Sequence, residues 1–223
     1  MKLYFYFLVL FLACCYSEAK AQSGMIQLPP GYNKIYYTDR IPGDVVGSPY
    51  LWEDWIKCSV SFRNGQILQD VAMRYNVYKG EMQYKTGKGI FIIGAPDSIL
   101  SLKFSDRTFI YTKFDENNSQ KKDYFEVVSD GKAQILVRHM MQIIKSNYNV
   151  ALDVGEKNDH LRLKEVYYVK KDNLVAEVDK KGKTLLNLLA DKSVQLSDFI
   201  KKNHPSFKDK ADLCRVTEYY NSL

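Results

Sequence analysis

The stretch MRYNVYKGEMQY, residues 73–84, decides the fold, because apolar and polar residues alternate on both sides of Lys79-Gly80. Such alternation is typical of strands with one face on a core and one face in water. A glycine at the second position of a two-residue loop suits the turns that join hairpin strands. The stretch therefore predicts a hairpin in which Tyr75 lies opposite Tyr84.

The preceding stretch, VSFRNGQIL, contains Asn64-Gly65, one of the strongest short signals for a hairpin. This loop places Phe62 opposite Ile67 and puts the apolar face of the new strand on the same side as the first hairpin. Gln69 is the exception to the pattern, and a bend or a sheet edge would account for it. We expect three adjacent strands at about 57–63, 66–78 and 81–86.

More strands follow along the chain. Apolar or alternating runs include GIFIIG, SILSLKF and RTFIYTKF, and further hairpins are predicted around Asp130-Gly131 and Asp172. Neighbours in sequence that pair in space form a meander. We therefore expect an antiparallel meander of about eight to ten strands over residues 22–179, either a large curved sheet or a partly open barrel.

After Asp179 the apolar period changes from two to that of a helix. Two or three short amphipathic helices are predicted over residues 180–223, packed on the sheet as a tail. The predicted class is thus α+β, with the β-meander first and the helices last.

The N-terminus resembles a targeting segment. Lys2 precedes an apolar run over residues 3–15, and the pattern Ala-x-Ala ends at Ala21. We expect residues 1–21 to be a signal peptide cleaved between Ala21 and Gln22, because the run is too short to span a bilayer. Two alternatives are an uncleaved anchor and a lipoprotein acylated at Cys14.

Two cysteines follow the predicted signal peptide, Cys58 and Cys214. Export permits a disulfide bond, and these two residues form at most one. The alternative is that both are free thiols, since free cysteine is among the most buried residue types. Two cysteines are too few for a disulfide scaffold or for a zinc site built from cysteines.

The charge of the chain is +6, and it is uneven. Residues 180–223 hold nine Lys and Arg against five Asp and Glu. This basic tail either meets anionic lipid or an acidic partner, or is a solvated lysine-rich helical face. We predict no nucleic-acid partner, because no nucleic-acid-binding motif accompanies the charge. Membrane association is expected only through the tail or a lipidated Cys14.

No motif for catalysis, nucleotide binding or metal binding occurs, so we predict no catalytic residue and no cofactor. His139 falls late in a predicted strand and is interpreted as a packed or surface histidine. Asp153, Glu156 and Asp159 crowd one loop with His160. Acidic loops bind calcium, but the EF-hand spacing is absent, and a solvated loop is the alternative that we prefer.

Both tryptophans lie in SPYLWEDW, residues 48–55. Exposed aromatic and arginine side chains serve interfaces, so Trp52, Trp55, Arg74 and Tyr78 form a candidate interaction surface. The alternative is that the tryptophans cover one end of the sheet while the polar face of the first hairpin is merely hydrated.

Several features together resemble a group of exported bacterial proteins of unknown function. They are the signal-peptide end, SPYLWEDW, RYNVYKGEM and the closing YYNSL. The resemblance implies export and the order of sheet before helices, and it carries no activity.

From the whole sequence we expect an exported cell-envelope protein with a binding or structural role, acting on an envelope protein. It would be periplasmic or extracellular, or an outer-membrane lipoprotein. The alternative is a periplasmic carrier that holds an apolar or lipid ligand against the curved sheet, an analogy of architecture alone.

Overall fold

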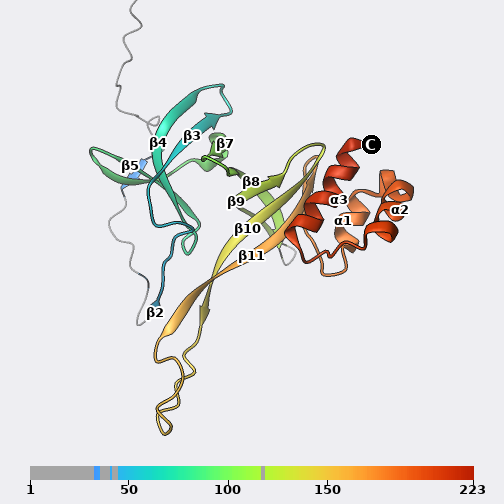
Figure 1. The fold of residues 1–223 in the computed structure, drawn as a ribbon. Coiled ribbons are helices and arrows are strands. Elements are labelled where there is room, and N and C mark those ends of the chain that lie inside the picture. Colours follow the sequence, from blue (N-terminus) through green and yellow to red (C-terminus); the bar gives the residue numbers. More distant parts are fainter. Residues whose placement is uncertain (1–32, 36–40, 42–44, 117–118) are drawn as a thin grey trace, which may run out of the picture.

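Most of the chain folds into one large β-sheet that carries three short helices after its last strand (Figure 1). The computed structural model describes residues 33–35, 41, 45–116 and 119–223. The predicted cleavage site at Ala21 and Gln22, and Cys14, lie outside these residues. The sheet has twelve described strands, and the predicted α+β class, with the helices at the C-terminal end, is confirmed.

The first half of the sheet is an antiparallel meander, as expected. Its strands are β3 (Ile56–Phe62), β4 (Ile67–Asn76), β5 (Glu81–Thr86) and β6 (Gly89–Ile93), with β1 (Asn33–Ile35) paired to β6. The three strands predicted from the two hairpins are therefore present and adjacent.

The second half is a second meander, joined to the first at β3. Its strands are β7 (Ile99–Lys103), β8 (Thr108–Glu116), β9 (Ser119–Ser129), β10 (Ala133–Ile144), β11 (Asp159–Lys171) and β12 (Leu174–Glu177). A single continuous meander would place β7 beside β6. Instead, a short link that includes the 3₁₀ turn η1 (Pro96–Ser98) leads β7 to the open edge of β3.

The opening hairpin has a four-residue turn instead of the predicted two-residue loop. Tyr75 consequently lies opposite Met82, not opposite Tyr84. The side chain of Asn76 stabilises the longer turn by accepting a hydrogen bond from the Lys79 N–H at 3.0 Å. Because the register differs by two residues, residues 73–76 and 81–84 keep their predicted faces, although Asn76 and Gln83 of the polar face are buried.

A bulge at Asp70 explains why Gln69 broke the alternation. Asp70 has a φ of 56°, and β4 gains one extra residue relative to β3 at this point. Beyond the bulge the faces are exchanged, so Ile67 lies opposite Ser61 and is 56% exposed. Leu68 packs against the core in its place. The prediction that Ile67 belongs to the apolar face is therefore wrong.

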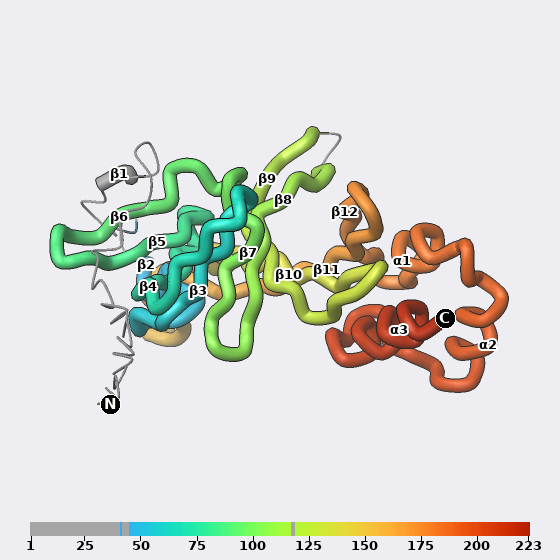
Figure 2. The backbone as a smooth tube through the Cα atoms, turned by 90° about the horizontal axis from the view of Figure 1, so that it is seen from above, coloured from blue at the N-terminus to red at the C-terminus, as the bar shows by residue number. Residues whose placement is uncertain are grey.

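The helices pack on one face of the second meander, at the end of the sheet remote from β1 to β6 (Figure 2). They are α1 (Lys183–Leu188), the 3₁₀ turn η2 (Ala190–Lys192), α2 (Ser193–Asn203) and α3 (Lys210–Ser222). Leu185, Leu196 and Leu213 are fully buried there against Ile135 and Val169 of the sheet. This burial of apolar surface stabilises the tail on the body.

The opposite face of the second meander is curled, which brings β12 close to β8. Aromatic rings fill the inside of the curl. Phe114, Phe125 and Tyr168 meet edge to face, with ring centroids 5.1 to 5.5 Å apart. The concave face is thus packed with side chains over this stretch.

Asn221, near the end of α3, binds the helical tail to the loop between β9 and β10. Its side-chain oxygen accepts from the Ala133 N–H at 2.9 Å, and its nitrogen donates to the carbonyls of Asp130 and Ala133. The asparagine in the closing YYNSL therefore satisfies three backbone groups of a distant hairpin.

Replacing Asn221 with alanine should lower the free energy of unfolding by about 1–3 kcal/mol, because backbone groups lose their partners. Urea denaturation measures the change. Asn203→Ala is the matched control, since among the described residues the Asn203 side chain bonds only within its own helix, to the Phe199 carbonyl. Equal effects from the two variants would contradict the tethering role of Asn221.

Candidate functional site

The predicted surface of Trp52, Trp55, Arg74 and Tyr78 does not form as one patch. Trp52 packs into the core under the first meander, with its ring 4.8 Å from Phe104 and 6.0 Å from Phe109. The alternative interpretation, in which tryptophan covers the sheet, describes this residue. The segment is not helical, however, so the two tryptophans do not share a helical turn.

Trp55 and Arg74 do lie together, and Tyr50 joins them. The Arg74 guanidinium lies 3.8 Å from the centroid of the Tyr50 ring and 4.4 Å from that of Trp55, and its Nε donates to Gln83 at 3.0 Å. Each such cation–π contact stabilises by roughly 0.5–2 kcal/mol. The group binds residues 50–55 to the sheet, which gives Arg74 a structural role. Tyr78 is half-buried, and its backbone N–H donates to the Pro49 carbonyl at 3.2 Å.

Cys58 and Cys214 are free thiols in different parts of the core, so the possible disulfide between them is absent. Cys58 is buried in β3, and burial raises its pKa to about 12. Cys214 lies in α3, where burial also raises its pKa. Neither thiol is activated as a nucleophile.

His139 is buried, and it lies at the centre of a group of ionisable side chains of which only Glu126 is buried with it. Its Nε2 lies 2.7 Å from the Glu126 carboxylate, and its Nδ1 lies 3.9 Å from that of Glu165. Arg107 lies 3.7 Å from Glu126, and Lys210 of α3 lies 3.8 Å from Glu165. The histidine is therefore a packed residue, one of the two alternatives from the sequence, and its buried partner was not foreseen.

Burial raises the pKa of Glu126, but the hydrogen bond with His139 and the charge of Arg107 outweigh burial and hold that pKa below its usual value of 4.5. The ionised carboxylate thus links His139 of β10 to Arg107, the residue before β8.

No metal centre is evident in the described ranges, where no group of three or more His, Cys, Asp or Glu side chains is placed so that it could hold a metal ion. The acidic loop considered for calcium is paired with cations instead. Lys145 lies 2.7 Å from Asp159, and Lys157 lies 3.5 Å from Asp153. The loop is solvated, as preferred from the sequence.

The same loop forms the end of a long arm. Beyond Met141, β10 pairs with no described strand except β11. In the same stretch β11 also makes a short parallel pairing with β2 (Val45–Val46). Figure 1 shows the two strands leaving the body as a ribbon. A two-stranded ribbon is marginally stable alone, so its projection into solvent is unusual for a structural element.

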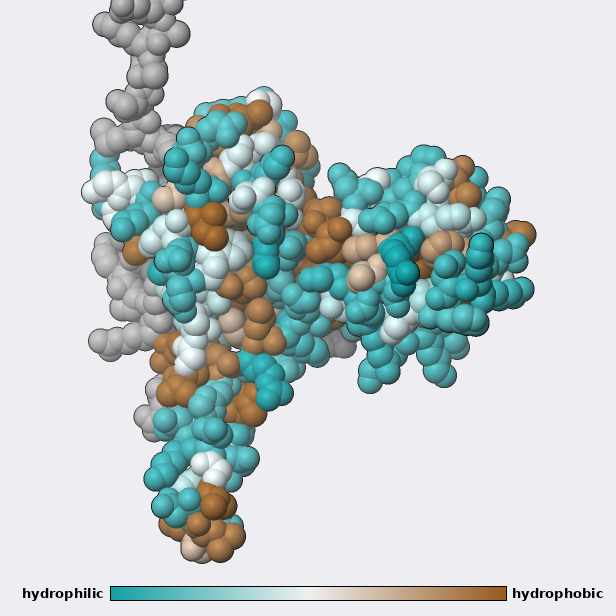
Figure 3. Space-filling view, viewed as in Figure 1, coloured by the Kyte–Doolittle hydropathy of each residue, from teal (hydrophilic) through white to brown (hydrophobic). Residues whose placement is uncertain are grey.

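The tip of this arm is ordered, and its apolar side chains face water. Asn149 pairs with Val154 across the turn, and the Tyr148 hydroxyl donates to Asp153. Three side chains of alternate residues are nevertheless exposed: Val150 by 81%, Leu152 by 68% and Val154 by 56%. They form the apolar end of the arm in Figure 3. Val150, Leu152 and Val154 are called the apolar tip below.

Sequence reasoning missed the apolar tip. Its signal is the alternation of Val150, Leu152 and Val154 between Asn149 and Gly155, inside a loop otherwise rich in charge. The acidic residues of the loop suggested cation binding, and the apolar residues between them were not considered as a site.

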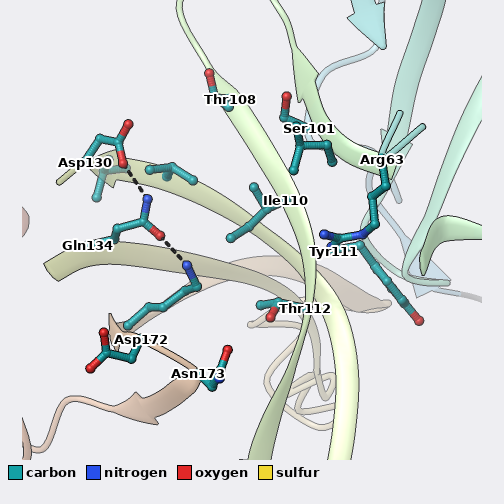
Figure 4. Close-up of a pocket in the computed structure, with 14 residues that line it drawn as sticks. Arg63, Ser101, Thr108, Ile110, Tyr111, Thr112, Asp130, Gln134, Asp172 and Asn173 are labelled. Carbon is teal, nitrogen blue, oxygen red and sulfur yellow. Dashed lines mark hydrogen bonds between the residues drawn. The ribbon is translucent and has the colours of Figure 1, made fainter. Parts of the chain in front are cut away.

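A groove of about 690 Å³ opens on the curled face, near the turn between β11 and β12 (Figure 4). Thr108, Ile110 and Thr112 form one wall, and Gln134 and Lys170 lie across from them. The volume is within the range of small-molecule sites. The side chains are mostly polar, which does not suit an acyl chain.

Comparison of the chain with protein-family models, with curated proteins and with solved structures found no match. No helix in the described part of the chain combines the length and the apolar character needed to cross a bilayer. The geometry of the chain itself therefore carries the functional argument.

The thiols give a first test. In the unfolded, unreduced protein both Cys58 and Cys214 should react with N-ethylmaleimide, since no bond joins them. In the folded protein Cys214 should react first, because it is less buried than Cys58. Mass spectrometry of peptides counts the labelled cysteines. If neither Cys58 nor Cys214 reacts in the unfolded, unreduced protein, the two are joined by a disulfide bond.

Glu126→Gln should destabilise the protein at neutral pH, because His139 and Arg107 lose the carboxylate. A lowered pKa means that the charge stabilises the fold above the unfolded value near 4.5, and that this stabilisation is lost as pH falls through the folded pKa. Unfolding free energies should therefore converge for the two proteins in acid. Asp115→Asn, at an exposed position of β8, is the control and should show no such convergence.

Proposed function

We propose that this is an exported binding protein without catalytic activity, which attaches to a partner protein through the apolar tip of its arm. The observation that carries the proposal is the exposure of Val150, Leu152 and Val154 on an ordered ribbon. Single exposed apolar residues are normal on a protein surface, but three adjacent ones at a projecting end are typical of an interaction site.

Burial of the tip in a complementary pocket supplies the attraction. Each Val or Leu side chain removed from water contributes about 1.5–3 kcal/mol, before the cost of association is subtracted. The tip is ordered before binding, since Asn149 accepts hydrogen bonds from the N–H groups of Ala151 and Leu152 at 3.0 and 3.2 Å. An ordered tip loses little conformational freedom on docking.

A protein partner fits better than a bilayer. Asp153 lies between Leu152 and Val154, and its side chain is paired with Lys157 at the tip. Charged groups are costly in the hydrocarbon region of a membrane. A protein pocket, by contrast, accommodates apolar side chains while its polar rim leaves the ion pair hydrated.

The alternative of an apolar-ligand carrier gains no support from the site. Phe114, Phe125 and Tyr168 occupy the inside of the curl, where an acyl chain would have to lie. Export itself is supported by the N-terminal sequence, with its apolar run and Ala-x-Ala pattern ending at Ala21.

The triple variant V150S/L152S/V154S should abolish partner binding and leave the fold intact, because all three side chains are exposed. A photoreactive amino acid at position 152, introduced in cells that naturally make the protein, should crosslink one protein identified by mass spectrometry. That protein, once purified, should bind the triple variant at least about tenfold more weakly than the native chain.

The matched control is I67S/L174S/V194S, which replaces three equally exposed apolar residues outside the arm. It should bind the partner like the native chain, and a photoreactive group at position 194 should not capture it. Crosslinks to lipid alone, or equal weakening in both triple variants, would overturn the proposal.

A further inference from the structure

The groove on the curled face lies apart from the arm, and its walls come from strands distant in sequence. Thr108, Ile110 and Thr112 project from the same face of β8, and Val127 of β9 is the cross-strand partner of Thr108. Lys170 of β11 completes the opposite side (Figure 4). The hollow depends on the curl of the sheet, so it is a feature of the fold and not of a single loop.

A chain of hydrogen bonds fixes one wall. Lys170 donates to the Gln134 side-chain oxygen at 2.9 Å, and the Gln134 nitrogen donates to Asp130 at 2.5 Å. Gln134 and Lys170 are also cross-strand partners in the ladder of β10 and β11. These groups are held in place before any ligand arrives, and Lys170 retains further N–H groups for donation.

Other polar groups at the groove make no side-chain hydrogen bond within the described residues. They include the hydroxyls of Thr108 and Thr112 and the side chains of Asp172 and Asn173 in the turn between β11 and β12. Hydroxyls both donate and accept, amides do both, and carboxylates accept. The groove thus presents both hydrogen-bond donors and hydrogen-bond acceptors.

The charges at the groove balance. Arg63 and Lys170 supply two cations, and Asp130 and Asp172 supply two anions. A ligand with one sign of charge, such as a polyphosphate, would meet as much repulsion as attraction. Ile110 and Val127 add apolar lining beside these polar groups.

We propose that this groove binds a short neutral oligosaccharide. Sugar hydroxyls donate and accept, as the walls do, and the C–H faces of sugar rings match the apolar lining. The volume of about 690 Å³ accommodates more than one ring. The site goes beyond the function proposed for the arm and shares none of its residues, so each stands or fails alone.

The purified protein is titrated with chitotetraose, cellotetraose and maltotetraose, and binding is measured by calorimetry. At least one should bind. Asp172→Asn and Lys170→Met should each weaken that binding by about tenfold or more, because a charged hydrogen-bonding group is lost. Asparagine tolerates the φ of 53° at position 172, so this variant keeps the turn.

Asp70→Asn and Lys164→Met are the matched controls. Asp70 also has a positive φ, and Lys164 lies on the same strand as Lys170, outside the groove. Both should bind the sugar like the native chain. The proposal fails if none of the three sugars binds, if the groove variants bind normally, or if only inorganic phosphate or tetra-alanine binds.

Discussion

The ladder between β10 and β11 is the interaction on which the rest of the structure depends. It runs without interruption through twelve pairs, from Ala133 opposite Lys171 to Ile144 opposite His160. At one end the helices cover one face of the ladder, and aromatic rings cover the other face. At the other end both faces are exposed, and the strands become the arm. One continuous set of backbone hydrogen bonds therefore spans the best-packed and the least-packed regions of the described chain.

The sequence predicts which face of the sheet a side chain lies on better than it predicts the residue opposite it in the neighbouring strand. The alternation around Tyr75 fixes which face each side chain lies on, because a register change of two residues preserves the face. It does not fix the turn, where the side chain of Asn76 favours a longer loop than glycine alone suggests. At Asp70 a single extra residue reverses the faces. In the sequence, the sign of this bulge is the break in the apolar–polar alternation at Gln69.

The candidate sites were harder to predict, for a different physical reason. The groove and the charged group around His139 combine residues of β8 to β11 with residues from outside these strands, and the long-range pairing that brings them together leaves no local pattern. Composition left Trp52 either on an interaction surface or covering one end of the sheet, and its ring packs against Phe104 and Phe109 in the core. The apolar tip is the exception, because its three alternate residues lie within one short segment that could have been recognised.

The geometry of the arm also makes it a lever. A force on the tip passes along the two strands and enters the body where β10 joins β9 through three register pairs and β11 joins β12 through four. These short joints attach the arm to the body. Asn221 binds the first residue of β10, at the end of that strand remote from the tip. Tension applied by a bound partner would therefore load these joints first, and after them the contact between Asn221 of the helical tail and the start of β10.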